Sequence, residues 1–569
     1  MSNGPREKQR RAGLGLSRRD CFGLPLLALT AGSAWSKSSV SPAATTSLQA
    51  GNDYAVVRSK AGALRGYIRR KTFSFKGIPY GEPTGGANRF AAPLPCKPWS
   101  GVRSCLSYGP VCPQPTQGNL GGDEAHFLVP IEQGFQSEDC LRLNVWTPAL
   151  DTGAKLPVMV FLHGGRYTTG SSQSLRAYDG ENLAQRHQVV VVTLNHRLGV
   201  FGFLDLAHRA AEHAQTGNLG MLDITLALRW VQENIRAFGG DPQRVTVFGQ
   251  SGGAGKVAAL LAMPKAIGLF HRAIAQSGPV LKLREPATSQ AMADALLESL
   301  GQKNFNFTQL QSLEPSLLLK ASDEVLSRYE GPIFSPDLSA GHDTVGWAPV
   351  IEAQVLIAHP FSPPALRLSA DIPLMVGTTL NEIGNSIDEP LGKELTEQAL
   401  RGRVKETFGE KAGEVIEAFR RDTPHATPAE LWSRIASAPV RQVAIEQCAR
   451  KTAFGAARSW LYWFQWQTPV LDGRPGAFHT SELPFVFDNS ERCDSITGGG
   501  PGPQRLADQM AGAWTAFARS GDPNGSGLPR WPAYDSTRGA TMIFDTRCES
   551  KDSPDGVELA ALADTATKR

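Results

Sequence analysis

Several features that mark particular protein classes are missing from this 569-residue chain. It has no long polar or repetitive tract and no internal repeat, which argues against a disordered or fibrous protein. No Cys-x-x-Cys pair or Cys/His cluster has the spacing of zinc ligands. No basic patch is interleaved with aromatic residues, so nucleic-acid binding has no support. With 41% hydrophobic and 20% charged residues, the composition is that of an ordinary globular protein.

The first 45 residues differ from the rest and have the pattern of an export signal. Basic residues lead up to the pair Arg18-Arg19, and the stretch from Leu24 to Trp35 is mostly apolar and uncharged. About a dozen apolar residues are too few to span a bilayer, which needs about 20. The arginine pair makes the segment similar to a bacterial twin-arginine leader. Cleavage after Ala34 and cleavage after Ala43 both fit, and a disordered basic tail or a membrane anchor is the alternative interpretation.

The leader accounts for the basic charge of the chain and for one of its cysteines. Residues 1–34 contain six basic and two acidic residues, so the formal net charge of +4 falls to zero without them. Of the eight cysteines, Cys21 leaves with the leader and seven remain, so at least one is unpaired in a monomer. We expect a periplasmic or secreted protein with disulfides and with no stable membrane anchor after processing.

Between residues 157 and 279, apolar runs typical of strands alternate with helical segments. Val158 to Leu162 and Val189 to Leu194 are nearly continuous apolar runs, as expected for strands buried on both faces of a parallel sheet. Leu219 to Ile235 has apolar residues at helical spacing. Strands that alternate with helices predict a parallel α/β sheet with right-handed crossovers.

The sheet is expected to continue through long helical insertions. Residues 290–345 and 390–450 are helical in composition, whereas Pro373 to Val376 and Trp460 to Trp466 return to strand-like runs. A helix over Ala507 to Ala518 and a last strand at Met542 to Phe544 follow. Length alone would suggest about three or four domains.

The segment Gly249-Gln250-Ser251-Gly252-Gly253 directly follows a predicted strand, 245–248, and precedes an apolar helix, Val257 to Met263. This context is typical of a nucleophile elbow, whose sharp turn needs small flanking residues and exposes the serine hydroxyl above the sheet. The N-terminus of the helix would lie beneath the oxyanion that forms on attack. Ser251 is therefore the candidate nucleophile, with a structural turn as the alternative.

A serine nucleophile needs a base to take its proton and an acid to hold that base, in the chain order Ser, acid, His. His479 follows the strand 460–466 and a Gly/Pro loop, where a catalytic base is expected, although a solvated loop histidine has the same pattern. Glu382 follows the buried run at 373–376, where a surface glutamate is the alternative. Four other histidines follow Ser251. His271 lies in a helix-like segment, 270–274, and no strand directly precedes His342, His359 or His425.

The oxyanion needs at least two backbone amide donors. The segment Phe161-Leu162-His163-Gly164-Gly165-Arg166-Tyr167, at the end of strand 158–162, is the expected Gly-rich loop. Its glycines let backbone amides face a substrate without obstruction by side chains. An ordinary strand-ending turn is the alternative.

Taken together, these residues resemble the type-B carboxylesterase and cholinesterase family over most of the chain. The resemblance implies one α/β-hydrolase domain over residues 46–569, with a mostly parallel central sheet flanked by helices and long helical insertions. The resemblance also rests on four further stretches of sequence: Ser137 to Asn144, Asn195 to Gly199 with Gly202 to Leu204, Asn218 to Asp223, and Phe238 to Pro242.

The resemblance also implies roles for single residues. The triad acid and base would be Glu382 and His479, from the loops that match Gly377 to Glu382 and Phe478-His479 with Glu482. A disulfide would join Cys112, within Val111-Cys112-Pro113-Gln114, to Cys140. The oxyanion donors would be three backbone amides, those of Gly165, Arg166 and Gly252.

The chain departs from the family pattern close to the nucleophile. The usual third glycine of the oxyanion loop is Arg166, which brings a long cation near the pocket. The usual acidic residue before the serine is Gln250, and the usual alanine after it is Gly252. In cholinesterases a tryptophan between the paired cysteines binds the choline cation, and residues 113–139 contain none. A choline ester is therefore not expected as the preferred substrate.

The implied activity is hydrolysis of a small-molecule carboxylic ester through an acyl-enzyme on Ser251, with no metal or cofactor. One alternative is a non-catalytic adhesion or binding protein, because relatives with this fold can lose the serine and keep the surface. Another is an enzyme that acts on amides or lactams, or that transfers the acyl group to an alcohol. The same triad serves each of these reactions.

Overall fold

The computed structural model describes residues 48–115, 122–302, 304–329, 346–387, 395–525 and 527–563. The expected leader and His342 lie outside these residues. From residue 48 on, the described residues belong to one unit.

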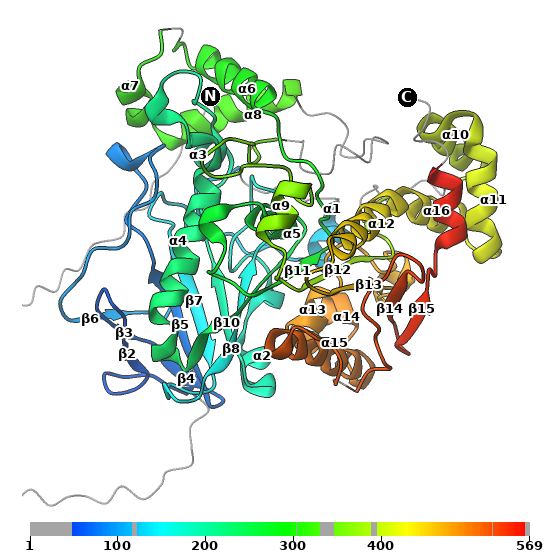
Figure 1. Ribbon diagram of the computed structural model, residues 1–569, viewed down its shortest axis with the longest axis horizontal. Coiled ribbons are helices and arrows are strands. Elements are labelled where there is room, and N and C mark those ends of the chain that lie inside the picture. Colours follow the sequence, from blue (N-terminus) through cyan, green and yellow to red (C-terminus); the bar gives the residue numbers. More distant parts are fainter. Residues whose placement is uncertain are drawn as a thin grey trace, which may run out of the picture. The chain divides into compact units, whose positions relative to one another are not determined.

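A twelve-stranded sheet runs through the described residues (Figure 1). Its seven central strands pair in parallel from β9 to β14, and the strands at both edges pair antiparallel. This is the mostly parallel sheet that the sequence predicted. In spatial order the strands are β1 (Leu48–Gln49), β4 (Tyr67–Arg69), β5 (Thr72–Pro79), β7 (Arg142–Thr147), β9 (Val190–Leu194), β8 (Leu156–Leu162), β10 (Gly240–Gln250), β11 (Arg272–Gln276), β12 (Leu374–Thr379), β13 (Ser459–Phe464), β14 (Ala540–Phe544) and β15 (Glu549–Asp552).

A second, small sheet is formed by the short strands β2 (Val56–Arg58), β3 (Ala63–Arg65) and β6 (Val102–Ser104). Its strands are three residues each, as expected where glycine and proline interrupt the apolar runs.

The central strands β8 and β9 are almost entirely apolar because both of their faces are covered. In β8, Val158 and Val160 pack into one hydrophobic cluster, whereas Met159 and Phe161 pack into another. Alternate side chains of a strand point to opposite faces, so the two clusters are the two sides of the sheet. The continuous apolar runs therefore correctly predicted strands buried on both faces.

Helices cover both faces of the sheet. Helices α4, α5 and α12 contact the central strands on the side of the first cluster, and α2 and α15 contact them on the other. The helices are α1 (Gly122–Leu128), α2 (Glu181–His187), α3 (Gly199–Phe203), α4 (Leu219–Asn234), α5 (Gly252–Leu261), α6 (Pro286–Ser299), α7 (Phe307–Ser312), α8 (Pro315–Tyr329), α9 (Pro363–Leu368), α10 (Glu397–Phe408), α11 (Ala412–Asp422), α12 (Pro428–Phe454), α13 (Leu483–Val486), α14 (Asp494–Thr497), α15 (Pro501–Ser520) and α16 (Gly556–Ala563).

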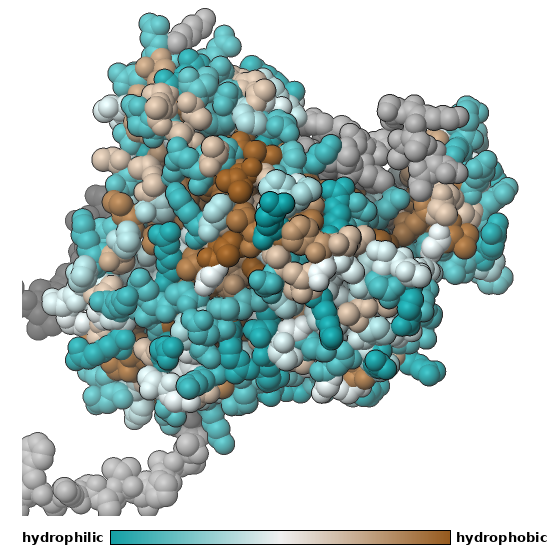
Figure 2. Space-filling view, viewed as in Figure 1, coloured by the Kyte–Doolittle hydropathy of each residue, from teal (hydrophilic) through white to brown (hydrophobic). Residues whose placement is uncertain are grey.

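The second helical insertion packs around a core of its own, whereas the buried side chains of the first insertion join the main core. Helices α10, α11 and α16 pack with the start of α12 around a third hydrophobic cluster, which includes Leu400, Val415 and Leu431. On the face shown in Figure 2, hydrophobic residues gather near the centre and hydrophilic residues surround them. Among the described residues, none of the helices combines the length and the apolar character needed to cross a membrane.

One element prediction is wrong. The sequence analysis assigned residues 270–274 to a helix, but Arg272–Gln276 is strand β11, which pairs in parallel with β10 and β12. Alanine at residues 273 and 275 favours a helix in isolation, but here both side chains are buried in the sheet. Burial between two neighbouring strands overrides that local preference.

Candidate active site

Ser251 stands at the junction of β10 and α5, at the carboxyl end of a central strand. Its backbone has φ 59° and ψ −128°, a conformation that residues with side chains rarely adopt. A β-carbon on Gly249 would lie 2.5 Å from the backbone of Gly253. One on Gly253 would overlap the carbonyl oxygen of Leu162. The sharp turn therefore requires both glycines, as expected for a strand-turn-helix elbow.

Hydrogen bonds to the neighbouring strand and helix hold this strained turn. The backbone amide of Ser251 donates to the carbonyl oxygen of Gln276 on β11, at 2.8 Å. The carbonyl oxygen of Ser251 accepts from the amide of Ala254 on α5, at 2.9 Å. Ser251 itself is partly exposed, whereas its neighbours Gln250 and Gly252 are buried.

Glu382 and His479 lie in loops that follow the adjacent parallel strands β12 and β13. Nδ1 of His479 is 2.6 Å from Oε2 of Glu382. The Glu382 side chain is 2% exposed and the His479 side chain is 33% exposed, so the imidazole can be reached from solvent while the carboxylate cannot. The other carboxylate oxygen, Oε1, accepts from the amide of Thr379 at 2.7 Å. The structure thus brings together the two residues that the sequence analysis singled out.

Asn381 ties these two loops together. Its amide donates to the carbonyl oxygen of Ala477 at 3.0 Å, and its Oδ1 accepts from the amide of Ala477 at 2.9 Å. Its Nδ2 donates to Oγ of Ser433 on α12, which in turn donates to the carbonyl oxygen of Ile383. A buried helix therefore fixes the relative position of the carboxylate and the imidazole.

Gln250 connects His479 to the elbow. Its Nε2 lies 3.2 Å from Nε2 of His479, and its side chain is buried. With the Nδ1–H group donating a hydrogen bond to Glu382, Nε2 of the imidazole is an acceptor, and the amide of Gln250 donates to it. The basic nitrogen of His479 is therefore next to the residue that precedes Ser251.

The glycine-rich loop after β8 lies against the start of α5. Gly165 has φ 85° and Arg166 has φ 54°, so the loop turns through two residues in the left-handed region. The carbonyl oxygen of Gly165 accepts from the amides of Thr168 and Thr169. A β-carbon on Gly252 would lie 2.5 Å from the carbonyl carbon of Arg166. The three predicted amide donors thus belong to two segments in direct contact.

Glu482 is a second buried carboxyl group beside Glu382, and its electrostatic importance was missed by the sequence analysis. It is 0% exposed, and its Oε1 accepts from Nε2 of Gln276 at 3.3 Å. Burial, together with the charge of Glu382, raises the pKa of Glu482 to about 7. Its position three residues after His479 was the only signal in the sequence, and it does not reveal burial.

The expected disulfide is not present in the structure, where Cys112 and Cys140 are both thiols. The two residues are nonetheless in contact, because their side chains are within hydrogen-bonding distance. That hydrogen bond and burial raise the pKa of the Cys140 thiol well above its usual value. The remaining cysteines of the described residues are also thiols.

Two of the histidines that were set aside, His271 and His359, have other partners in the structure. Nδ1 of His271 contacts the amide of Val245, and Nε2 of His359 lies 3.2 Å from Glu285. Within the described ranges, no group of three or more histidine, cysteine or acidic side chains is placed to hold a metal ion.

Comparison with known proteins agrees with this geometry. A model of the carboxylesterase family matches residues 53–560. The chain is similar to the para-nitrobenzyl esterase of Bacillus subtilis, with 34% identity over 89% of this chain and 98% of that protein. It is also similar to the human cocaine esterase, with 34% identity over 81% of this chain and 82% of that protein.

Solved structures give the same result. An esterase from Clostridium hathewayi, described as able to hydrolyse aliphatic aromatic polyesters, superposes with a TM-score of 0.77 at 34% identity, over 91% of this chain and all of that one. A carboxylesterase from Geobacillus stearothermophilus superposes with a TM-score of 0.74 at 38% identity, over 89% of this chain and all of that one.

Proposed function

This chain belongs to the carboxylesterase family, and we propose that it hydrolyses carboxylic esters with a triad of Ser251, His479 and Glu382. The observation that carries the proposal is the 2.6 Å contact between His479 and Glu382, made by two loops at the carboxyl ends of adjacent parallel strands. The strained serine stands at the same end of β10, in the same sheet.

The reaction proceeds by acyl transfer in two halves. For the attack, Nε2 of His479 gives up its hydrogen bond from Gln250 and takes the Ser251 proton as Oγ attacks the ester carbonyl. The protonated imidazole then gives that proton to the departing alcohol. Water attacks the acyl-enzyme by the same route and releases the acid. The buried carboxylate of Glu382 holds the imidazole by Nδ1 and stabilises its positive charge.

The oxyanion formed in each half is held by the backbone amides of Gly165, Arg166 and Gly252. The contact between the Arg166 backbone and Gly252 supports a common site for the three donors. Gly252 is the first residue of α5, so the positive end of the helix dipole adds to the same stabilisation. Each donor of this kind is worth roughly 3 kcal/mol of transition-state stabilisation.

The substrate is a small ester without a quaternary cation. The residue before the serine, Gln250, is neutral and its amide is directed at His479, so it offers no counter-charge to choline. Residues 113–139 contain no tryptophan on which such a cation could stack.

The deciding experiment is hydrolysis of short and medium p-nitrophenyl esters by the mature protein and its Ser251→Ala variant. We expect kcat to fall by about 10⁴ to 10⁶ in the variant. Ser277→Ala is the matched control, because Ser277 is a buried serine with φ 51° directly after the neighbouring strand β11. Full activity in Ser251→Ala, or equal loss in Ser277→Ala, would contradict the assignment.

The protein is exported to the periplasm or beyond, where thiol–disulfide exchange with an oxidising disulfide of that compartment converts the two thiols of Cys112 and Cys140 to a disulfide and reduces the oxidant to thiols. Support comes from the arginine pair of the leader and from the contact between the two buried thiols. Fractionation of cells that carry the Arg18→Lys, Arg19→Lys variant tests the export, which should fail in the variant.

The oxidation has its own test, a count of free thiols in the purified exported protein. Cys448→Ser should lower that count by one, because Cys448 is a buried thiol outside the pair. The variant with serine at both residue 112 and residue 140 should leave the count unchanged, because those two sulfurs are already bonded to each other. A loss of two thiols in that variant would contradict the disulfide.

A further inference from the structure

The helix that begins at the elbow carries a fully buried lysine. Lys256 lies in α5 and is 0% exposed, and its Nζ donates to the carbonyl oxygen of His163 at 2.9 Å. Removing an ammonium group from water costs several kcal/mol, so a lysine in a core is rarely there for packing alone. Its contact residue, His163, directly precedes the two glycines of the oxyanion loop.

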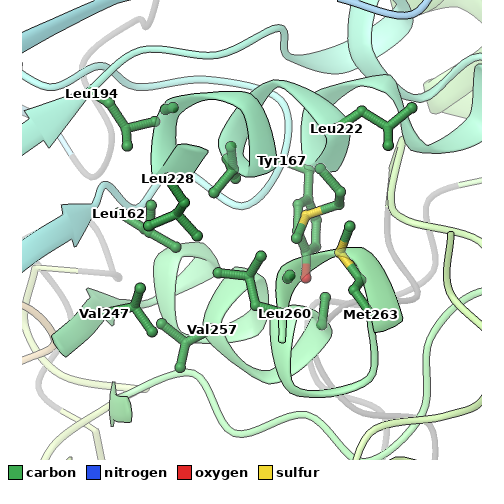
Figure 3. Close-up of a cluster of buried hydrophobic side chains, with 14 of the residues drawn as sticks. Leu162, Tyr167, Leu194, Leu222, Leu228, Val247, Val257, Leu260 and Met263 are labelled. Atoms are coloured by element: carbon green, nitrogen blue, oxygen red, sulfur yellow. The ribbon is translucent and has the colours of Figure 1, made fainter. Parts of the chain in front are cut away.

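A second contact of Lys256 lies at the other end of that loop. Its Nζ is 5.6 Å from the centre of the Tyr167 ring, within the range of a cation–π interaction. Tyr167 directly follows Arg166, and its side chain belongs to the buried cluster drawn in Figure 3, together with Leu260 and Met263. The same ammonium therefore touches the residues on both sides of the segment Gly164–Arg166.

The lysine also sets the charge of its surroundings. The rings of His163 and His196 are stacked, with centres 5.1 Å apart. Burial, and then the charge of Lys256, lower the pKa of both imidazoles well below the usual value. Their Nδ1 atoms contact the carbonyl oxygens of Gly164 and Arg197. The rings are therefore neutral, and the positive charge beneath the loop is that of the lysine.

We propose that Lys256 is a positioning residue for ester hydrolysis, which holds the oxyanion loop at both ends and places a buried positive charge behind its amide donors. The carbonyl oxygen that Lys256 binds lies against the first turn of α5, because a β-carbon on Gly253 would come within 3.0 Å of it. Gly253 directly follows the donor Gly252. This role rests on the proposed function, since it presumes that the oxyanion forms at these amides.

The role predicts a selective loss of transition-state binding. Lys256→Met shortens the side chain by one heavy atom and removes its charge and its donor. We expect kcat per active site to fall about tenfold to a hundredfold, because removing or misplacing oxyanion donors costs this much or more. KM should change less than about threefold, because the ground-state ester does not carry the oxyanion charge.

Inhibitors separate positioning from general damage. A trifluoromethyl ketone forms a charged tetrahedral adduct with the serine, whereas the matching methyl ketone binds without that charge. In Lys256→Met the inhibition constant of the first should rise by the same factor as kcat/KM falls, and that of the second should stay within about twofold. Active sites are counted with a fluorophosphonate, and Val257→Ala, the next buried residue of the same helix, is the control.

Lys256→Gln provides a second test if the methionine variant does not fold. It is neutral but keeps a donor, and it should show the same selective loss for the fluorinated ketone, to a smaller degree. Unchanged kcat and inhibition constants per active site, or an equal loss for both ketones, would overturn the proposal. Failure of the wild-type protein to react with the fluorophosphonate would instead contradict the proposed triad.

Discussion

Gly252 lies directly against the backbone of Arg166, so that a β-carbon on residue 252 would stand 2.5 Å from the carbonyl carbon of residue 166. Both positions depart from the family pattern, which has alanine at the first and glycine at the second. Arg166 adopts φ 54°, a conformation that costs about 1 kcal/mol or more for a residue with a side chain. The two departures are therefore neighbours in space, and the absence of a side chain at residue 252 accommodates the arginine-containing loop.

We expect Gly252→Ala to be a poor enzyme. The new methyl group would meet backbone atoms, which cannot move aside as a flexible side chain can, so the oxyanion loop must shift. A displacement of about 1 Å in such a loop lowers kcat about a hundredfold. Glycine at residue 166 allows the loop to relax, so the double variant Arg166→Gly, Gly252→Ala should recover part of the loss.

The matched control for Gly252→Ala is Gly402→Ala. Gly402 lies inside α10, and an added β-carbon there would meet no atom within 4 Å. That variant should keep full activity and should be about 1 kcal/mol more stable, as alanine is a better helix former than glycine. Full activity of Gly252→Ala would show that the loop adapts without cost.

The sequence predicted those features of the fold that depend on the order of residues within a short segment. Buried strands such as β8 and β9 are continuous apolar runs, and the elbow combines a strand, small residues and a helix within a few positions. Strand β11 was missed because its segment is short and contains alanine, and because it forms a strand through pairing with β10 and β12 on its two sides. Local pattern therefore predicted the sheet but not every strand in it.

Contacts between distant segments could not be predicted in the same way. The lysine at residue 256 occupies a helix, where its usual place is the surface, and its partner His163 is 93 residues away. The contact of Gly252 with Arg166 joins two departures that the sequence presents separately. Such pairs depend on how the loop after β8 packs on α5, which is a property of the folded sheet.

Two buried carboxyl groups close to His479 should differ sharply in their effect on the reaction. Glu382→Gln leaves the shape of the site but replaces the charged acceptor of Nδ1, so the imidazole loses its preferred tautomer. We expect kcat to fall by about 10³ to 10⁴. The carboxyl group of Glu482 accepts from Gln276, and Glu482→Gln should lower kcat by less than about tenfold. Steady-state rates with active sites counted give the comparison, and the reverse order of losses would make Glu482 the triad acid.

Glu482 should also make stability depend on pH. Its pKa of about 7 in the folded protein exceeds the value of 4.5 that applies to an unfolded chain, so the folded state binds the proton more tightly. The free energy of unfolding should therefore fall as the pH rises from about 4.5 to 7, and level off above. A shift of this size corresponds to about 3 kcal/mol.

Urea denaturation of Glu482→Gln and the wild type at pH 5 and pH 8 measures this effect. Glutamine cannot ionise, so the variant should gain stability relative to the wild type by about 2 kcal/mol between the two pH values. The control is Glu298→Gln at an exposed glutamate of α6, which should change little at either pH. A difference between variant and wild type that is the same at both pH values would contradict the burial effect.

Removing one partner of the buried ion pair of Arg197 and Asp223 should cost much more stability than removing one partner of a pair on the surface. The side chains of the buried pair are 2% and 0% exposed, with Nη2 2.7 Å from Oδ1 and Nε 2.9 Å from Oδ2. Asp223→Asn leaves the guanidinium buried without its counter-charge, so we expect a loss of about 3 to 5 kcal/mol in the free energy of unfolding. Asp294→Asn, at an exposed aspartate paired with Arg209, should cost less than about 1 kcal/mol. Both are measured by urea denaturation at one pH, and equal losses in the two variants would show that burial does not set the strength of this pair.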